Sequence, residues 1–139
     1  MKKVVTLGEV MLRLVPPNNA RFTQAQSFNA TFGGGEANVA ASLAQFGLSA
    51  AHITAFPENE LGEAAINYFK QLGVETAFML QRGKRIGTYY VEFGSALRAS
   101  KIIYDREFSA MALAQPEWFD WDKIFDGADW FHWTGITPA

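Results

Sequence analysis

The sequence of 139 residues contains no cysteine and only two histidines. Without cysteine there can be neither a disulfide framework nor a thiolate metal site, which fits a reducing compartment. No run approaches the roughly 18 consecutive apolar residues that a membrane-spanning helix needs. Glu9 and Arg13 interrupt the apolar stretch that a signal peptide would need after Lys3. We therefore expect a cytoplasmic protein that does not engage a membrane.

The sequence also has no large excess of positive or negative charge. Lys and Arg number 12 and Asp and Glu number 14, which gives a net charge of −2, and no basic run is present. The sequence therefore predicts no nucleic-acid partner. His52 and His132 each lie between apolar neighbours, so we interpret both as structural and predict no metal site. A hydrophobic content of 49% is that of a globular chain that can bury a core.

The first part of the chain alternates between strand patterns and helix patterns. Continuous apolar runs predict buried strands over residues 3–8, 51–56 and 74–80. Helices are predicted between Gly35 and Gly47 and between Asn59, a good N-cap, and Gly73. This alternation predicts an α/β fold with a mostly parallel central sheet, flanking helices and right-handed crossovers.

A second, smaller sheet is predicted from runs that have no helix between them. Residues 87–93 and 101–106 form a predicted hairpin, which we expect to pair with residues 11–15 and 27–32. The remaining patterns predict short helices over residues 110–114 and 117–125 and a strand over residues 129–134.

Three consecutive glycines, Gly33, Gly34 and Gly35, precede the first predicted helix. They lack Cβ atoms and lie beside the free N–H groups of a helix N-terminus, so they could bind a hydroxyl or an anion. They are not a dinucleotide fingerprint, which needs its glycines directly after the first strand, where Gly8 and Glu9 lie. A tight strand-to-helix turn without a ligand is the alternative interpretation.

Tyr104 and Arg106 are two residues apart in a predicted strand, so their side chains point to the same face. An arginine guanidinium can hold a carboxylate through two parallel N–H bonds. Tyr89, on the paired strand, could project toward the same side. Taken alone, the pair is better explained by a solvent-facing arginine on an edge hairpin, and a carboxylate clamp is the functional alternative.

Several motifs together resemble a known family. Residues 33–40 (GGGEANVA), with Gly47 and the pair Leu61 and Gly62 downstream, are similar to the N-terminal signature of the ribokinase-like, or PfkB, carbohydrate kinases. A more specific resemblance, to 2-keto-3-deoxygluconate kinases, rests on residues 6–9 (TLGE), 87–89 (GTY), 104–106 (YDR) and 134–139 (TGITPA). The resemblance covers essentially the whole chain.

The resemblance implies a ribokinase-like, Rossmann-like α/β fold with a small antiparallel β lid, formed by about residues 11–32 and 85–107. The lid of such kinases closes over the sugar and often mediates dimers, so a homo-oligomer is expected. The implied reaction transfers a phosphoryl group from ATP, with Mg²⁺, to a sugar or sugar acid, most closely 2-keto-3-deoxygluconate. Residues 1–139 would be the N-terminal part of a single sugar-kinase domain.

The resemblance also assigns substrate-binding positions. Gly34 would offer its backbone to sugar hydroxyls and Tyr89 would contact the sugar, while Tyr104 and Arg106 would hold a substrate carboxylate. Ile136 would lie near the floor of the site. The other signature positions carried over are Gly33, Gly35 and Asn38.

The sequence departs from the family's pattern in two places. Arg13 stands where many sugar kinases of the family carry an aspartate, which disfavours a fructokinase or ribokinase and suits a sugar acid. The family's catalytic aspartate, in a late Gly-Ala-Gly-Asp motif, is absent, so we name no catalytic residue. We expect a truncated, inactive piece without the ATP site. The alternatives are another PfkB kinase, or an inert sugar-binding or dimerisation module.

Overall fold

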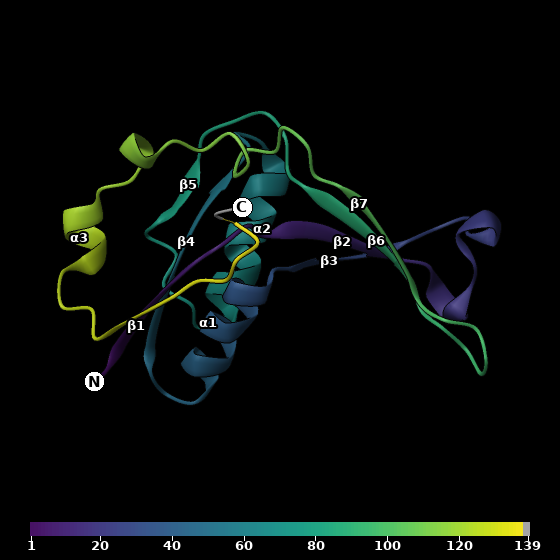
Figure 1. Ribbon diagram of the computed structural model, residues 1–139, viewed down its shortest axis with the longest axis horizontal. Coiled ribbons are helices and arrows are strands. Elements are labelled where there is room, and N and C mark those ends of the chain that lie inside the picture. Colours follow the sequence, from purple (N-terminus) through teal and green to yellow (C-terminus); the bar gives the residue numbers. More distant parts are fainter. Residues whose placement is uncertain (138–139) are drawn as a thin grey trace.

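The computed structural model describes residues 1–137 and contains two sheets, one of which projects from the main body (Figure 1). The first sheet is parallel throughout. Its strands, in spatial order, are β5 (Met79–Gln81), β4 (Ser49–Phe56), β1 (Lys3–Leu7) and β8 (Trp130–His132). The mostly parallel central sheet is therefore confirmed. Pro138 and Ala139, which end the motif at residues 134–139, lie outside the described residues.

The second sheet, which we call the lid sheet, projects from this body (Figure 1). Its strands, in spatial order, are β3 (Asn29–Gly33), β2 (Met11–Val15), β6 (Thr88–Glu92) and β7 (Lys101–Asp105). The outer pairings β2–β3 and β6–β7 are antiparallel, and the central pairing β2–β6 is parallel. A parallel pairing is possible because a long crossover through β4 and β5 separates β2 from β6.

Side chains cover both faces of the parallel sheet. On one face, α1 (Gly35–Gln45) and α2 (Glu60–Gln71) contribute Ala37 and Phe69, which pack with Phe56 of β4. On the opposite face, Phe119 and Ile124 pack with Val5, Ile53 and other strand residues. Burial on both sides explains why β4 is a continuous apolar run in the sequence.

Local signals place both helices. The side chain of Asn59 caps α2, since its Oδ1 accepts the N–H groups of Leu61 and Gly62 at 3.1 and 3.2 Å. Gly47 and Gly73, which follow the two helices, have φ values of +83° and +85°, a conformation that favours glycine. No helix among residues 1–137 has the length and apolar character needed to cross a membrane.

The predictions for residues 110–125 are wrong in detail. Residues 110–114 form turns instead of a helix, and the Oγ of Ser109 accepts the N–H of Ala112 there at 3.1 Å. The predicted helix over residues 117–125 is divided into a 3₁₀ turn, η3 (Pro116–Trp118), and a short helix, α3 (Trp121–Phe125). The extended backbone of Phe119 separates them, and Asp120 caps the second.

Other predicted bounds also change. The strand over residues 74–80 is reduced to β5, because a turn precedes it in which the N–H of Met79 bonds the carbonyl of Thr76 at 3.0 Å. The link between β2 and β3 contains two 3₁₀ turns, η1 (Pro17–Asn19) and η2 (Phe22–Gln24). Residues 27 and 28 therefore precede β3, and that strand runs on to Gly33.

His52 is a structural histidine, as its apolar neighbours indicate. Its ring is fully buried, with Nδ1 2.6 Å from the hydroxyl of Thr6 and Nε2 3.2 Å from the carbonyl of Gly8. A carbonyl can only accept, so Nε2 carries the proton and Nδ1 accepts from Thr6. Burial lowers the pKa of His52 to about 3, against a smaller opposing effect of the bond to Gly8. The neutral ring thereby holds the turn at Gly8.

This pKa makes stability depend on pH. Because the unfolded pKa is 6.5 and the folded pKa is about 3, only the unfolded state binds a proton as the pH falls between these values. The contribution of His52 to stability is complete above pH 6.5 and is lost progressively below it, by up to about 1.4 kcal/mol per pH unit. Denaturant unfolding at pH 7.5 and pH 5.5 should show a loss about 1 kcal/mol larger for the protein than for its His52→Gln variant. Equal losses would contradict this assignment.

Candidate functional site

The candidate site lies where the two sheets meet. Three chain segments converge there: the turn of Gly8 and Glu9 after β1, the glycines at the junction of β3 and α1, and Arg106 directly after β7. The first segment belongs to the parallel sheet and the third to the lid sheet. Open α/β sheets place ligands at the carboxyl ends of their strands, and β1 ends here.

The three glycines of the signature have different surroundings. A methyl group on Gly34 would lie 2.3 Å from the carbonyl oxygen of Glu9, so this position has no room for a side chain. A methyl group on Gly33 would lie 3.0 Å from the hydroxyl of Tyr89, and one on Gly35 would meet nothing within 4 Å. The close approach of the Glu9 backbone therefore explains why residue 34 is a glycine. This supports the interpretation as a tight turn and leaves room for a ligand at Gly33.

The lid sheet presents two tyrosines and an arginine in one row. Cross-strand pairing joins Arg13 to Tyr89 and Tyr89 to Tyr104, so the three side chains share a face. The two tyrosine rings are stacked, with centroids 6.0 Å apart and planes 24° from parallel. Burial raises the pKa of the Tyr89 phenol, opposed in part by the charge of Arg13. The Tyr89 hydroxyl therefore stays protonated near neutral pH and can donate a hydrogen bond.

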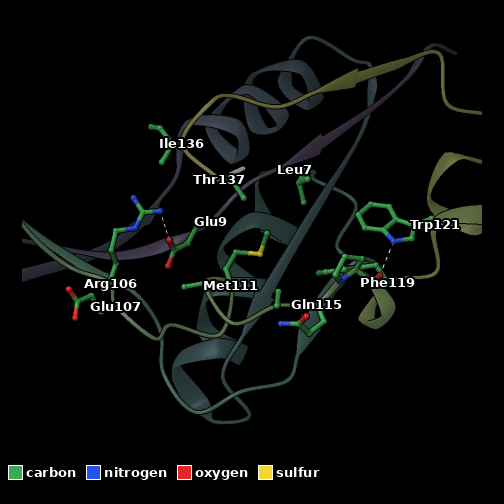
Figure 2. A pocket seen from close by; sticks show the side chains of 13 residues that line it. Leu7, Glu9, Arg106, Glu107, Met111, Gln115, Phe119, Trp121, Ile136 and Thr137 are labelled. Carbon is green, nitrogen blue, oxygen red and sulfur yellow. Dashed lines mark hydrogen bonds and ion pairs between the residues drawn. The ribbon is translucent and has the colours of Figure 1, made fainter. Parts of the chain in front are cut away.

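Arg106 is paired with Glu9. One of its terminal nitrogens donates to Oε2 of Glu9 (Figure 2). The other oxygen of Glu9 accepts a hydrogen bond from the hydroxyl of Ser109 at 2.6 Å. The Glu9 side chain is 5% exposed and that of Arg106 is 29% exposed. Arg106 is therefore not the solvent-facing arginine of the alternative interpretation, because a buried carboxylate fixes one edge of its guanidinium.

A cavity of about 590 Å³ opens beside this ion pair. Arg106 and Glu9 lie at one side of it, Met111, Phe119 and Trp121 form an apolar part, and Ile136 lies at its edge (Figure 2). Arg106 and Ile136, two of the predicted site residues, thus come together at one cavity. The other predicted residues do not line this cavity: Gly33, Gly34, Gly35, Asn38, Tyr89 and Tyr104.

Asn38 and Gly35 are exposed on the first turn of α1. The backbone N–H of Asn38 bonds the carbonyl of Gly34 at 2.8 Å, which is the first hydrogen bond of that helix. Among residues 1–137, no hydrogen bond or ion pair joins either residue to the tyrosines or to Arg106. Their assignment to the site stays a prediction from the signature.

Two buried acidic residues, Glu9 and Glu36, are absent from the set of residues predicted for the site. Glu36, in the first turn of α1, is 4% exposed and accepts a hydrogen bond from the hydroxyl of Thr134. A methyl group on Gly8 would lie 2.3 Å from its other oxygen. The sequence positions of these residues could have indicated a role in the site. Glu9 comes shortly after the first buried strand, and Glu36 comes directly after the three glycines.

The guanidinium of Arg106 can recognise an anion. A guanidinium with one edge bound to Glu9 still has N–H donors for a second carboxylate or for hydroxyls. Among residues 1–137, no group of three or more His, Cys, Asp and Glu side chains could hold a metal ion.

Comparisons with known proteins match the chain along its whole length. A family model described as pfkB family carbohydrate kinase matches residues 1–139. The 2-dehydro-3-deoxygalactonokinase of Haloferax volcanii is 37% identical over 137 residues, covering 99% of this chain and 43% of that protein.

Two solved structures are similar in sequence and in fold. The 2-dehydro-3-deoxygluconokinase of Thermotoga maritima is 53% identical with a TM-score of 0.97, covering 99% of this chain and 42% of that one. A PfkB family carbohydrate kinase of Listeria grayi is 36% identical with a TM-score of 0.93, covering 97% and 42%. The chain therefore spans less than half the length of these relatives.

The surroundings of the glycines predict opposite outcomes for two neighbouring substitutions. Gly34→Ala should lower the free energy of unfolding by about 1–3 kcal/mol, because the added methyl group overlaps the backbone of Glu9. Gly35→Ala, in open space, should leave stability unchanged or raise it slightly. Denaturant midpoints of the two variants would test this, and a stable Gly34→Ala protein would contradict the close contact.

Proposed function

Because this chain belongs to the pfkB family of carbohydrate kinases, we propose that the complete protein transfers the γ-phosphoryl group of ATP to a hydroxyl of a sugar acid, with 2-keto-3-deoxygluconate as the first candidate. The family supports the class of reaction, and the ribokinase-like fold agrees with it. The acceptor is supported by the names of two relatives, which share the 2-dehydro-3-deoxy sugar acid and differ in the sugar, gluco or galacto.

The observation that carries the acceptor is the position of Arg106. Its guanidinium borders the cavity, and Glu9 fixes one of its edges. A carboxylate accepts two parallel N–H bonds from the free edge of such a group. Tyr104, two residues earlier on the same face, adds a hydroxyl donor. A neutral sugar has no carboxylate for the free N–H groups of Arg106 and would not form this charge-assisted pair.

The other residues take supporting roles in this proposal. Tyr89 contacts the sugar from the lid sheet, the backbone at Gly33 and Gly34 meets sugar hydroxyls, and Ile136 forms part of the floor. Gly35 and Asn38 shape the start of α1. The lid sheet closes over the sugar and excludes water, so that the phosphoryl group goes to the sugar and not to water.

ATP, with Mg²⁺, supplies the phosphoryl group in this proposal. We assign the nucleotide site and the catalytic base to parts of such a kinase that these 139 residues do not span. The 139 residues would supply most of the acceptor site and the lid, and would not phosphorylate a sugar alone.

Two other functions can be distinguished from this one. A fructokinase or ribokinase type of enzyme would act on a neutral sugar and would not depend on Arg106. A catalytically inert module that binds sugar or forms dimers would show no kinase activity as a complete protein. A kinase assay of the complete protein against sugars and sugar acids separates the three.

Removing the guanidinium should selectively impair the sugar acid. In the complete enzyme, Arg106→Ala should reduce kcat/KM for 2-keto-3-deoxygluconate by about 100-fold, since a charge-assisted, bidentate interaction is lost. The reduction for a neutral sugar such as fructose should be much smaller. Arg21→Ala, which removes an exposed arginine in the link between β2 and β3, is the matched control and should change neither value. Equal reductions for both acceptors would refute the carboxylate clamp.

We also propose that the lid sheet joins two copies of the protein. β7 is an edge strand of that sheet, and Ile103, on the face opposite Tyr104, is 52% exposed. A sheet edge with exposed apolar side chains favours association with another chain.

This proposal predicts the effect of a charge on the lid. Ile103→Asp should convert an oligomer to a monomer in light-scattering measurements of the complete protein, because a carboxylate would be buried in the interface. Phe46→Asp, at an 80% exposed apolar residue after α1, is the control and should leave the mass unchanged. An unchanged mass for Ile103→Asp would place the interface elsewhere.

A further inference from the structure

We propose that Glu9 is a positioning residue, which orients the guanidinium of Arg106 for the carboxylate of the acceptor. The inference rests on the proposed function, since it concerns how Arg106 recognises a sugar acid. Glu9 comes from the loop after the central strand β1, and Arg106 comes from the end of the lid strand β7. The ion pair therefore attaches Arg106, at the end of the lid sheet, to the loop that follows β1 of the parallel sheet.

The environment of Glu9 determines its orientation. Oε2 accepts from Arg106 and Oε1 accepts from the hydroxyl of Ser109 at 2.6 Å. Ser109, 1% exposed, accepts the N–H of Ala112 at 3.1 Å, so its hydroxyl proton is directed at Glu9. A methyl group on Gly87 would lie 2.3 Å from Oε1, which shows how closely the lid backbone packs against this carboxylate. Glu9 has little freedom to rotate.

Arg106 by contrast depends on Glu9 for its orientation. Its guanidinium has no other hydrogen-bond or ion-pair partner among the described residues. An arginine side chain has several rotatable bonds and loses considerable entropy when it is fixed. Fixing one edge against a rigid carboxylate means that this entropy is lost before the acceptor binds, which favours binding.

The charge of Glu9 acts in the opposite direction. A second carboxylate close to Arg106 repels the carboxylate of the acceptor, so removal of the charge alone would strengthen binding. The sign of the effect on KM therefore distinguishes the two roles. If Glu9 positions Arg106, its loss raises KM for the acid. If it only reduces the local positive charge, its loss lowers KM.

Glu9→Gln in the complete enzyme tests the proposal. The amide keeps the size of the side chain but offers one acceptor oxygen to two donors. We expect KM for 2-keto-3-deoxygluconate to rise about tenfold, with kcat close to the parent value and KM for a neutral sugar unchanged. In an Arg106→Ala background the same substitution should add no further loss, since the two residues act as a unit.

Two further variants keep the test decisive. Asp105→Asn, which breaks the half-exposed ion pair with Arg85 one residue before Arg106, is the matched control and should leave KM unchanged. Ser109→Ala removes one of the two donors to Glu9 and should raise KM for the acid in the same direction by a smaller factor. It replaces Glu9→Gln as the test if thermal unfolding shows that the latter does not fold.

The possible outcomes separate this inference from the proposed function. If Arg106→Ala selectively impairs the acid and Glu9→Gln leaves KM unchanged or lowers it, Glu9 is not a positioning residue and the carboxylate clamp stands. A loss that is the same in the parent and Arg106→Ala backgrounds, or for acid and neutral sugar alike, shows a structural role only. If Arg106→Ala itself lacks selectivity, both proposals are overturned.

Discussion

The buried carboxylate of Glu9 joins the two sheets of this protein. Glu9 follows β1, an inner strand of the parallel sheet. Its hydrogen-bond partners, Arg106 and Ser109, follow β7, an edge strand of the lid sheet. A carboxylate that is 5% exposed must be paired, since an unpaired buried charge is strongly destabilising. The end of the lid is thereby held against the end of β1, and the cavity beside them is formed by the same contacts.

This arrangement explains three glycines that belong to the motifs shared with the family. Gly34 makes room for the backbone of Glu9, Gly87 for its side chain, and Gly8 for the side chain of Glu36. The close packing of two buried acidic residues thus limits the side chains around the site. Packing within the protein is therefore sufficient to require glycine at these positions.

The sequence predicts the architecture well because its patterns are long. The strand and helix alternation, the caps at Asn59 and Gly73 and the four segments of the lid sheet are all found in the structure. Residues 110–125 are less predictable, because elements of three to five residues depend on tertiary contacts and not on propensity. The pairing of Arg106 with Glu9 was also missed, since the two residues are 97 positions apart and no local pattern connects them.

The central claim is that Arg106, oriented by Glu9, receives the carboxylate of a sugar acid. A crystal structure of the complete protein with bound 2-keto-3-deoxygluconate tests it most directly. The account predicts a carboxylate oxygen within about 3 Å of a guanidinium nitrogen of Arg106, with Glu9 still bound to the opposite edge. A carboxylate held elsewhere, with Arg106 bound to Glu9 alone, would contradict it.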